Sequence, residues 1–408
     1  MKYQCLYTLA MSAVLGSMAS CVSPDASTRK EESVMDTKSL EFSWDHVPRY
    51  MHIYKRTDFT DEELAYLADY PLITFEKAQG TAEGSVQEGT LKAARAVKQR
   101  NPNAKILYYK NIVIDWTGSA ASEELNTIEG GYLQSSDGSY PVVNQRSKCR
   151  FFDISLPEVQ NWWMRDAAQM LGDPSIDGIF IDANIKVLHH AYFAKGKRVG
   201  EEKAQELKEG YEQLLIRINK AFRQDNIVLA NILRARLEHG GLDYLEHFDG
   251  SYLEGFEHNV DGVSRADYMA KGIACAQKAA RQGKVVALSI GLGTALDTDS
   301  SGIGLDEARA GVESLAAVQD RLDYVTAIFL VIAEKYSYFY PHDKYVVRED
   351  AAGKQFNRAW MQTLPVFTKR LGPPKGPAVR NGYTYTREFE HCSVWLNIES
   401  EIGRLNWK

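Results

Sequence analysis

The run Gly178-Ile179-Phe180-Ile181-Asp182 gives the clearest indication of architecture in this sequence of 408 residues. Its apolar residues are continuous rather than alternating, which is typical of a strand that is buried on both faces of a parallel sheet. The stability of such a strand does not require an aspartate at its end. The run therefore predicts a central parallel strand that carries a carboxylate at its C-terminal end.

On both sides of this run, short β-branched and aromatic segments alternate with longer segments of helical period, and this alternation predicts βαβ units. The predicted strands are 51–54, 72–75, 106–109, 178–182, 227–231, 251–254, 285–290 and 327–332. Helices are predicted up to about 68, at 90–100, from 157, and at 201–223, 264–282 and 305–320. Capping boxes at Thr60–Glu63 and Ser155–Glu158 mark two helix starts. The sequence predicts an α/β fold, a (β/α)8 TIM barrel over residues 41–345.

Two further regions stand outside this regular alternation. Residues 111–150 form a long excursion after the third strand, and inserted loops at this end of a barrel usually build the binding cleft. Residues 346–408 contain two stretches, 383–389 and 394–397, that alternate like β hairpins. We expect a small β-rich appendage at the C-terminus.

The N-terminus has the features of a targeting segment. Lys2 precedes an apolar run that is too short to cross a bilayer, which takes about 20 residues, and residues 18–21 read Met-Ala-Ser-Cys. This site resembles the bacterial lipobox, so we expect a signal peptide at 1–20, lipidation of Cys21 and a flexible tether at 21–40. An ordinary secretory signal is the alternative. Either reading predicts an exported protein, and the first predicts one anchored to the cell envelope.

Composition argues against several classes of protein. Without residues 1–20 the chain carries 47 basic and 54 acidic side chains, a formal charge of −7, and has no basic block, so nucleic acid is not an expected partner. Cys149, Cys275 and Cys392 lack the spacing of a zinc site or a disulfide framework. Adjacent His189 and His190 cannot both face one ion on a helix, and no metal or cofactor is expected.

Two carboxylates end predicted strands at the face where barrel enzymes carry their sites. Asp182 ends the fourth strand and Glu254 ends the sixth, and glycosidic bond cleavage needs one acid and one nucleophilic or basic carboxylate. We assign Asp182 as the nucleophile and Glu254 as the acid, which desolvation between Tyr252 and Phe256 would keep protonated. In the alternative readings Asp182 caps the following segment, and the role of Glu254 falls to a neighbouring carboxylate, Glu257 or Asp249.

Other polar and aromatic residues fall where loops leave the predicted strands, and these are the expected substrate-binding residues. They are Glu76, Lys110, Asp115, Trp116, Asp153, Asn231, Tyr252 and Tyr338. Charged groups at a barrel mouth bind sugar hydroxyls or adjust one another's ionisation, and aromatic rings stack on sugar faces. For Tyr338 and its neighbours, packing between the barrel and the appendage is an equally good reading.

Three motifs together resemble a known family. They are 152–159 (FDISLPEV), 177–182 (DGIFID) and 252–254 (YLE). They resemble the hypothetical glycoside hydrolase TIM barrels related to endo-α-1,4-polygalactosaminidases, over about residues 51–341. The resemblance implies that Asp182 and Glu254 are nucleophile and acid/base. Because the loop after the third strand is longer here, the substrate does not carry over.

These observations predict an exported glycoside hydrolase that cleaves a polysaccharide or oligosaccharide with an Asp/Glu pair, with retention of configuration. The chief alternative is a surface lipoprotein of the same fold that binds glycans without cutting them. A third is a barrel enzyme that acts on another exported substrate. A binding protein has no reason to place carboxylates at two opposed strand ends, so the sequence favours the hydrolase.

Overall fold

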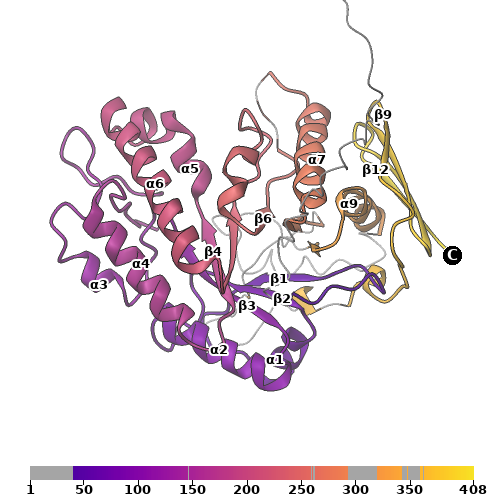
Figure 1. Ribbon diagram of the computed structural model, residues 1–408, viewed down its shortest axis with the longest axis horizontal. Coiled ribbons are helices and arrows are strands. Elements are labelled where there is room, and N and C mark those ends of the chain that lie inside the picture. The colour runs from indigo at the N-terminus through magenta and orange to yellow at the C-terminus, as the bar shows by residue number, and fades with distance from the viewer. Residues whose placement is uncertain are drawn as a thin grey trace, which may run out of the picture. The chain divides into compact units, whose positions relative to one another are not determined.

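The computed structural model describes residues 40–145, 147–258, 260, 262–292, 319–341, 347, 359–361 and 363–408 (Figure 1). The expected signal peptide, Cys21, all of the tether except Leu40, and residues 305–318 of one predicted helix lie outside this part of the chain. Among the described residues, no helix is both long and apolar enough to span a membrane.

Eight parallel strands form one sheet, in which each strand pairs with the next along the chain. They are β1 (Tyr50–Ile53), β2 (Leu72–Phe75), β3 (Lys105–Asn111), β4 (Gly178–Asp182), β5 (Ile227–Asn231), β6 (Gly250–Leu253), β7 (Val285–Ser289) and β8 (Ser337–Tyr340). A parallel bridge between Arg49 and Phe339 brings the last strand beside the first. This order and closure confirm the predicted (β/α)8 barrel.

The helices that connect the strands begin close to their sequence signals. They are α1 (Asp61–Ala68), α2 (Val86–Arg100), α3 (Ser122–Leu125), α4 (Pro157–Leu171), α5 (Asn184–Leu188), α6 (Glu201–Phe222), α7 (Arg265–Arg281) and α9 (Gln319–Ile332). The predicted capping box at Thr60 and Glu63 is confirmed at the start of α1. A second one, at Ser85 and Glu88, starts α2 four residues before the predicted position.

The capping box predicted at Ser155 is wrong. Helix α4 begins at Pro157, and its N-cap, Leu156, makes no side-chain cap hydrogen bond. The Ser155 hydroxyl instead donates to the Asp153 carboxylate, 2.6 Å away. Proline at the first helical position needs no partner for a backbone N–H, so this helix starts without the box.

The predicted eighth strand, 327–332, is also wrong, because these residues lie in α9. The helix is buried all round, from Tyr324 to Ile332, so it shows no amphipathic period that would distinguish it from a buried strand. The strand is the aromatic segment Ser337–Tyr340, which follows the helix.

The reason for this burial is the predicted C-terminal appendage, which is a four-stranded antiparallel sheet. Its strands are β9 (Val379–Asn381), β10 (Thr384–Glu388), β11 (Cys392–Asn397) and β12 (Ile402–Trp407). The sheet packs on α9 so closely that a Cβ at Gly403 would lie 2.5 Å from the Tyr324 Cα. Arg387, 3 % exposed, donates to the carbonyls of Leu330 and Ala333 at the C-terminal end of α9. The sheet therefore supplies the C-terminal cap of this helix.

Inside the barrel, aromatic rings from opposite strands meet. Tyr252 of β6 stacks on His52 of β1 at 4.6 Å between ring centres, and Phe180 of β4 approaches both rings edge-on. At the other end, Glu41 accepts from Tyr338 and from Asn103, just before β3, so the N-terminal segment covers the start of the strands. The interior is packed, and any site lies at the C-terminal ends of the strands.

Candidate active site

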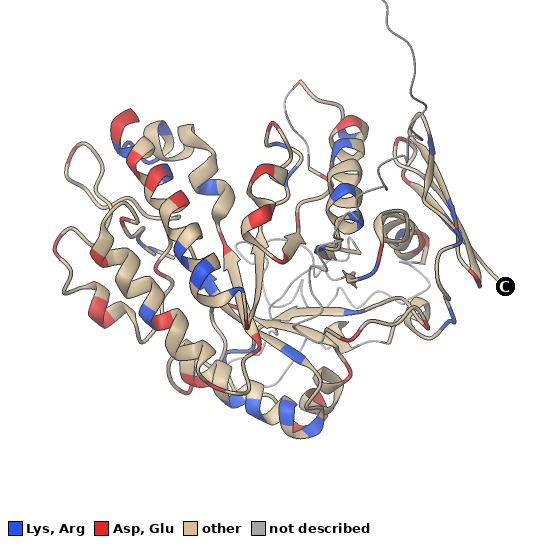
Figure 2. Cartoon of the chain, viewed as in Figure 1, with Lys and Arg blue, Asp and Glu red and all other residues tan. Residues whose placement is uncertain are grey.

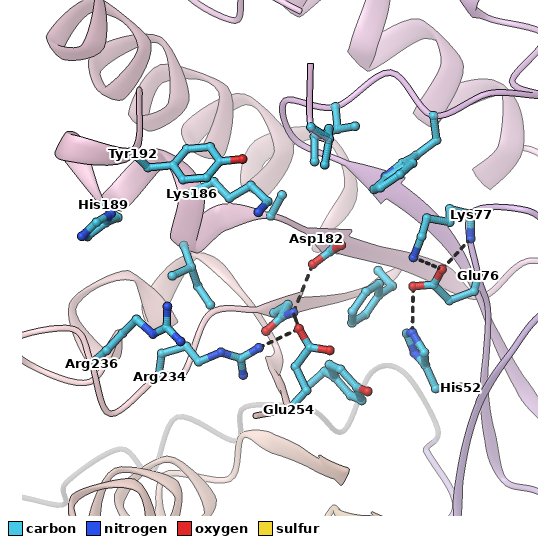
Figure 3. Close-up of a pocket in the computed structure, with 18 residues that line it drawn as sticks. His52, Glu76, Lys77, Asp182, Lys186, His189, Tyr192, Arg234, Arg236 and Glu254 are labelled. Atoms are coloured by element: carbon cyan, nitrogen blue, oxygen red, sulfur yellow. Dashed lines mark hydrogen bonds and ion pairs between the residues drawn. The ribbon is translucent and has the colours of Figure 1, made fainter. Parts of the chain in front are cut away.

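A pocket of about 420 Å³ opens at the C-terminal ends of the strands (Figure 3). Its volume falls within the usual range for small-molecule sites. Its polar and aromatic lining residues are His52, Glu76, Lys77, Trp116, Phe180, Asp182, Lys186, His189, Tyr192, Asn231, Arg234, Arg236, Tyr252 and Glu254. Both predicted catalytic carboxylates are among them.

The strand period explains why these carboxylates face the pocket. Successive side chains of a strand point to opposite faces, so a residue two positions after an inward ring also points inward. Phe180 and Tyr252 form the floor, and Asp182 and Glu254 stand two residues beyond them. Both strands place a carboxylate directly above an aromatic floor.

One amide group links the two carboxylates. The Asn231 Nδ2 group donates to Asp182 Oδ1 at 3.1 Å and to Glu254 Oε1 at 2.9 Å (Figure 3). These two bonds limit the separation of the two oxygens to their sum, 6.0 Å. Asn231 is only 4 % exposed, and its Oδ1 atom has no hydrogen-bond partner among the described residues. The two bonds from its Nδ2 group therefore hold Asp182 and Glu254 at a defined spacing.

Asp182 receives a second hydrogen bond from the other side. The Tyr109 hydroxyl donates to Asp182 Oδ2 at 2.7 Å. Burial raises the pKa of Tyr109 well above its usual value, and the charges of Asp182 and Glu76 raise it further, so this hydroxyl keeps its proton. The next helix, α5, has Ala183 as its N-cap and no side-chain cap hydrogen bond, so Asp182 does not act as a helix cap.

Glu254 has a different environment from the desolvated one that the sequence suggested. Its side chain is 44 % exposed, and Oε1 lies 2.8 Å from the Arg234 guanidinium. Among the described contacts, Oε2 has no hydrogen bond, and it remains available to a ligand. The next residue, Gly255, is exposed and has a positive φ of 56°, a conformation that glycine adopts without strain.

The neighbouring carboxylates that could have replaced Glu254 lie outside the pocket. Glu257 pairs with Arg265 and Arg321, and these ion pairs lower its pKa although burial opposes them. Asp249 pairs with Arg223 at 3.0 Å and precedes β6, at the opposite end of the barrel. The pocket therefore retains Asp182 and Glu254 as its central pair.

A third carboxylate, Glu76, faces the pair across the pocket. It is buried, 2.7 Å from Lys77 Nζ and 3.1 Å from His52 Nε2. Burial raises the pKa of Glu76, but Lys77 and His52 outweigh it and bring the pKa to about 2. The ammonium of Lys77 also lies 5.1 Å from the centre of the Trp116 ring, whose Nε1 donates to Tyr109. On this side of the pocket, Glu76, Lys77 and His52 are thus paired with one another, and Lys77 packs against the Trp116 ring.

Four of the predicted substrate-binding residues line the pocket, namely Glu76, Trp116, Asn231 and Tyr252. The structure places the other four elsewhere. Lys110 follows the inward Tyr109 by one position, points outward, and forms a buried ion pair with Asp166. Asp115 accepts hydrogen bonds from Tyr132, at 2.7 Å, and from Ser122, and it does not line the pocket.

The other two predicted residues that do not line the pocket, Asp153 and Tyr338, make contacts within the fold. Asp153 is 5 % exposed, accepts from Ser155, and pairs with Lys203 at 2.7 Å, so it joins the start of α4 to α6. Tyr338 points inward but is fully buried near the start of the strands, where its hydroxyl donates to the Glu41 carbonyl. Neither can meet a ligand in the pocket.

The sequence-based search missed a group of basic residues on the β4–β5 side. Lys186 lies on α5, and Arg234 and Arg236 lie in the loop after β5. Arg234 and Arg236 lie three and five residues after the end of β5, and this position after a barrel strand could have identified both arginines as site residues. Elsewhere on the described chain, acidic and basic side chains intersperse along the outer helices (Figure 2).

No group of three or more His, Cys, Asp or Glu side chains that could hold a metal ion occurs within the described part of the chain. Cys149 and Cys392 are buried, Cys275 is half-buried, and all three are free thiols. The side chains that line the pocket offer carboxylates, an amide, phenols, imidazoles, guanidinium groups and ammonium groups.

The family model described as hypothetical glycosyl hydrolase family 15 matches residues 98–393. The chain belongs to this family. The match includes both central carboxylates and Asn231, and membership of hypothetical glycosyl hydrolase family 15 confirms the predicted enzyme class, a glycoside hydrolase. No curated protein sequence matches the chain.

Several solved structures are similar to this member of hypothetical glycosyl hydrolase family 15. A noncanonic maltogenic α-amylase from Thermotoga neapolitana is 10 % identical, with 86 % of each chain covered and a TM-score of 0.47. An α-amylase from Geobacillus thermoleovorans is 9 % identical, with 87 % of each chain covered and a TM-score of 0.45. The α-galactosidase AgaA from Geobacillus stearothermophilus is 9 % identical. The match covers 86 % of this chain and 47 % of that chain, with a TM-score of 0.45.

Proposed function

We propose that this protein is an exported, retaining glycoside hydrolase that acts on a polysaccharide or oligosaccharide, with Asp182 as nucleophile and Glu254 as acid/base. The Asn231 bridge carries the proposal, because it holds the two carboxylate oxygens within 6.0 Å of each other. Retaining enzymes place their carboxyl groups about 5–5.5 Å apart, whereas inverting enzymes leave about 6.5–9.5 Å for a water molecule.

In the first step, an Asp182 oxygen attacks the anomeric carbon while the bond to the leaving oxygen breaks. Glu254 gives its proton to that oxygen, and Oε2 is the atom available for this, since Asn231 and Arg234 engage Oε1. In the second step, Glu254 takes a proton from water. The resulting hydroxide displaces Asp182 and restores both carboxyl groups.

Asn231 and Tyr109 hold Asp182 with one hydrogen bond to each of its oxygens. This fixes the direction of attack, and preorganised groups of this kind lower the barrier without moving during the reaction. Arg234 is placed to stabilise the Glu254 carboxylate that remains after proton donation.

The test is reducing-end release from a panel of α- and β-linked glycans by wild type, Asp182→Asn and Glu254→Gln. We expect each variant to lose the activity. Asp243→Asn and Glu202→Gln, which change exposed carboxylates outside the pocket, should retain it. NMR of the first sugar anomer released tests retention. Binding of a glycan by wild type without any cleavage would favour the alternative, a surface glycan-binding protein.

We also propose export as an envelope lipoprotein, supported by the apolar run before Cys21 and the small residues at the cleavage site. Labelled palmitate should enter the protein in a bacterial host. Cys21→Ser should abolish labelling, while Cys5→Ser, within the expected signal peptide, should not. Equal labelling of both variants would contradict the proposal.

A further inference from the structure

The pocket is lined by four cationic side chains, Lys77, Lys186, Arg234 and Arg236, and by three carboxylates, Glu76, Asp182 and Glu254. Lys77 is paired with Glu76, and Arg234 is paired with Glu254. Among the described residues, neither Lys186 nor Arg236 has a carboxylate within ion-pair distance, although both line the pocket. The Lys186 ammonium instead lies 4.7 Å from the centre of the Tyr192 ring. Figure 3 shows these cations on the opposite side of Asp182 from Glu76.

Arg236 lies close enough to Lys186 to affect its ionisation. Burial lowers the pKa of Lys186, the charges of Asp182 and Glu254 raise it, and Arg236 lowers it. Burial, Arg236 and Arg234 all lower the pKa of His258. Lys186 is half-buried and Arg236 is exposed, so both cations can reach an anion that binds in the pocket.

Arg234 adds a second, independent observation. It is 8 % exposed, and its Nη2 donates to Glu254 at 2.8 Å, but its buried Nη1 has no hydrogen-bond partner in the part of the chain that the structure describes. Nearly all buried polar groups are hydrogen-bonded, and an unpartnered guanidinium nitrogen is costly. Both the unpaired nitrogen and the two unpaired cations therefore point to a missing acceptor on this side of the pocket.

We infer that Lys186, Arg234 and Arg236 form an anion subsite that binds the charged group of an acidic sugar, either a uronate carboxylate or a sulfate ester. This inference rests on the proposed function, because it assigns the substrate class of the same pocket. Guanidinium groups suit both acceptors, since they donate two parallel hydrogen bonds to planar or tetrahedral oxyanions. A cationic amino-sugar polymer, as cleaved by the polygalactosaminidases named above, would face three cations here.

The experiment measures binding of free monosaccharides, which contain no glycosidic bond and so report on the subsite whether or not the protein cuts glycans. NMR titration would compare galacturonate with galactose, glucuronate with glucose, and a sulfated hexose with its unsulfated parent. We expect at least one acidic sugar to bind roughly ten to a hundred times more tightly than its neutral parent. Comparing the uronates with the sulfated hexose shows whether the subsite prefers a carboxylate or a sulfate ester.

Lys186→Gln and Arg236→Gln should each remove most of this preference without changing the melting temperature. Lys195→Gln is the matched control, because Lys195 is exposed on the adjacent turn outside the pocket. Arg236→Lys should retain part of the preference. Equal binding of acidic and neutral sugars, or a preference that survives in the double variant Lys186→Gln/Arg236→Gln, would overturn the inference.

The binding result separates the inference from the proposed function. If acidic sugars bind through Lys186 and Arg236 but no glycan is cut, the subsite stands and the hydrolase proposal falls. If neutral glycans are cut equally well by wild type and by both glutamine variants, the hydrolase stands and the acidic substrate class is wrong.

Discussion

Replacing Asn231 with leucine tests the geometry of the carboxylate pair most directly. A hydrogen bond to a charged group contributes roughly 1.5–3 kcal/mol, and Asn231 makes two. Water can replace part of the loss in an open pocket. We therefore expect a loss of about 2–4 kcal/mol of transition-state stabilisation, or roughly 30- to 1,000-fold in kcat/KM.

The assay is kcat/KM on the glycan identified in the panel, together with chemical denaturation. Leucine has a similar shape and removes a buried oxygen that lacks a partner, so stability should change by less than about 1 kcal/mol. Asn406→Leu, at an exposed position on β12, is the control and should leave both quantities unchanged. A folded Asn231→Leu protein with wild-type kcat/KM would refute the argument that the bridge sets the catalytic spacing.

Three further predictions concern stability. The lowered pKa of Glu76, from 4.5 to about 2, means that its ionised form stabilises the fold above pH 4.5 and that this contribution is lost as the pH falls toward 2. Glu76→Gln should therefore cost about 3 kcal/mol at pH 7 and flatten the acid dependence of urea denaturation between pH 5 and 2. Arg387→Leu should cost about 2–4 kcal/mol in the same assay, because it uncaps α9 and leaves buried carbonyls without donors. Gly403→Ala should cost about 1–3 kcal/mol by overpacking against Tyr324, whereas Gly376→Ala, with open space around it, should be nearly neutral.

The barrel and its central acids could be predicted because both follow from strand periodicity. The predicted bounds of the fourth strand, 178–182, are those of β4. Asp182 is the last residue of β4 and Glu254 directly follows β6, so both lie at the mouth of the barrel. The same periodicity, applied to β3, would have excluded Lys110, because Tyr109 and Lys110 must face opposite sides of the sheet.

Other errors have causes that lie outside the local pattern. Residues 324–332 of α9 are buried all round because the C-terminal sheet packs on the helix, and this tertiary contact cannot be read from residues 327–332 alone. The basic side of the pocket brings together Lys186, on α5 after β4, and Arg236, in the loop after β5. Loop conformation is the part of a barrel that sequence period does not determine.

The burial of α9 between the barrel and the C-terminal sheet also bears on modularity. Many accessory domains are joined to an enzyme by a linker and can be removed or exchanged, since each keeps its own core. Here one helix supplies core surface to both parts, and Arg387 of the sheet holds the carbonyls at its end. The sheet is thus an integral wall of the domain. Barrel and sheet should melt in one cooperative transition, and the sheet cannot be recombined as an independent unit.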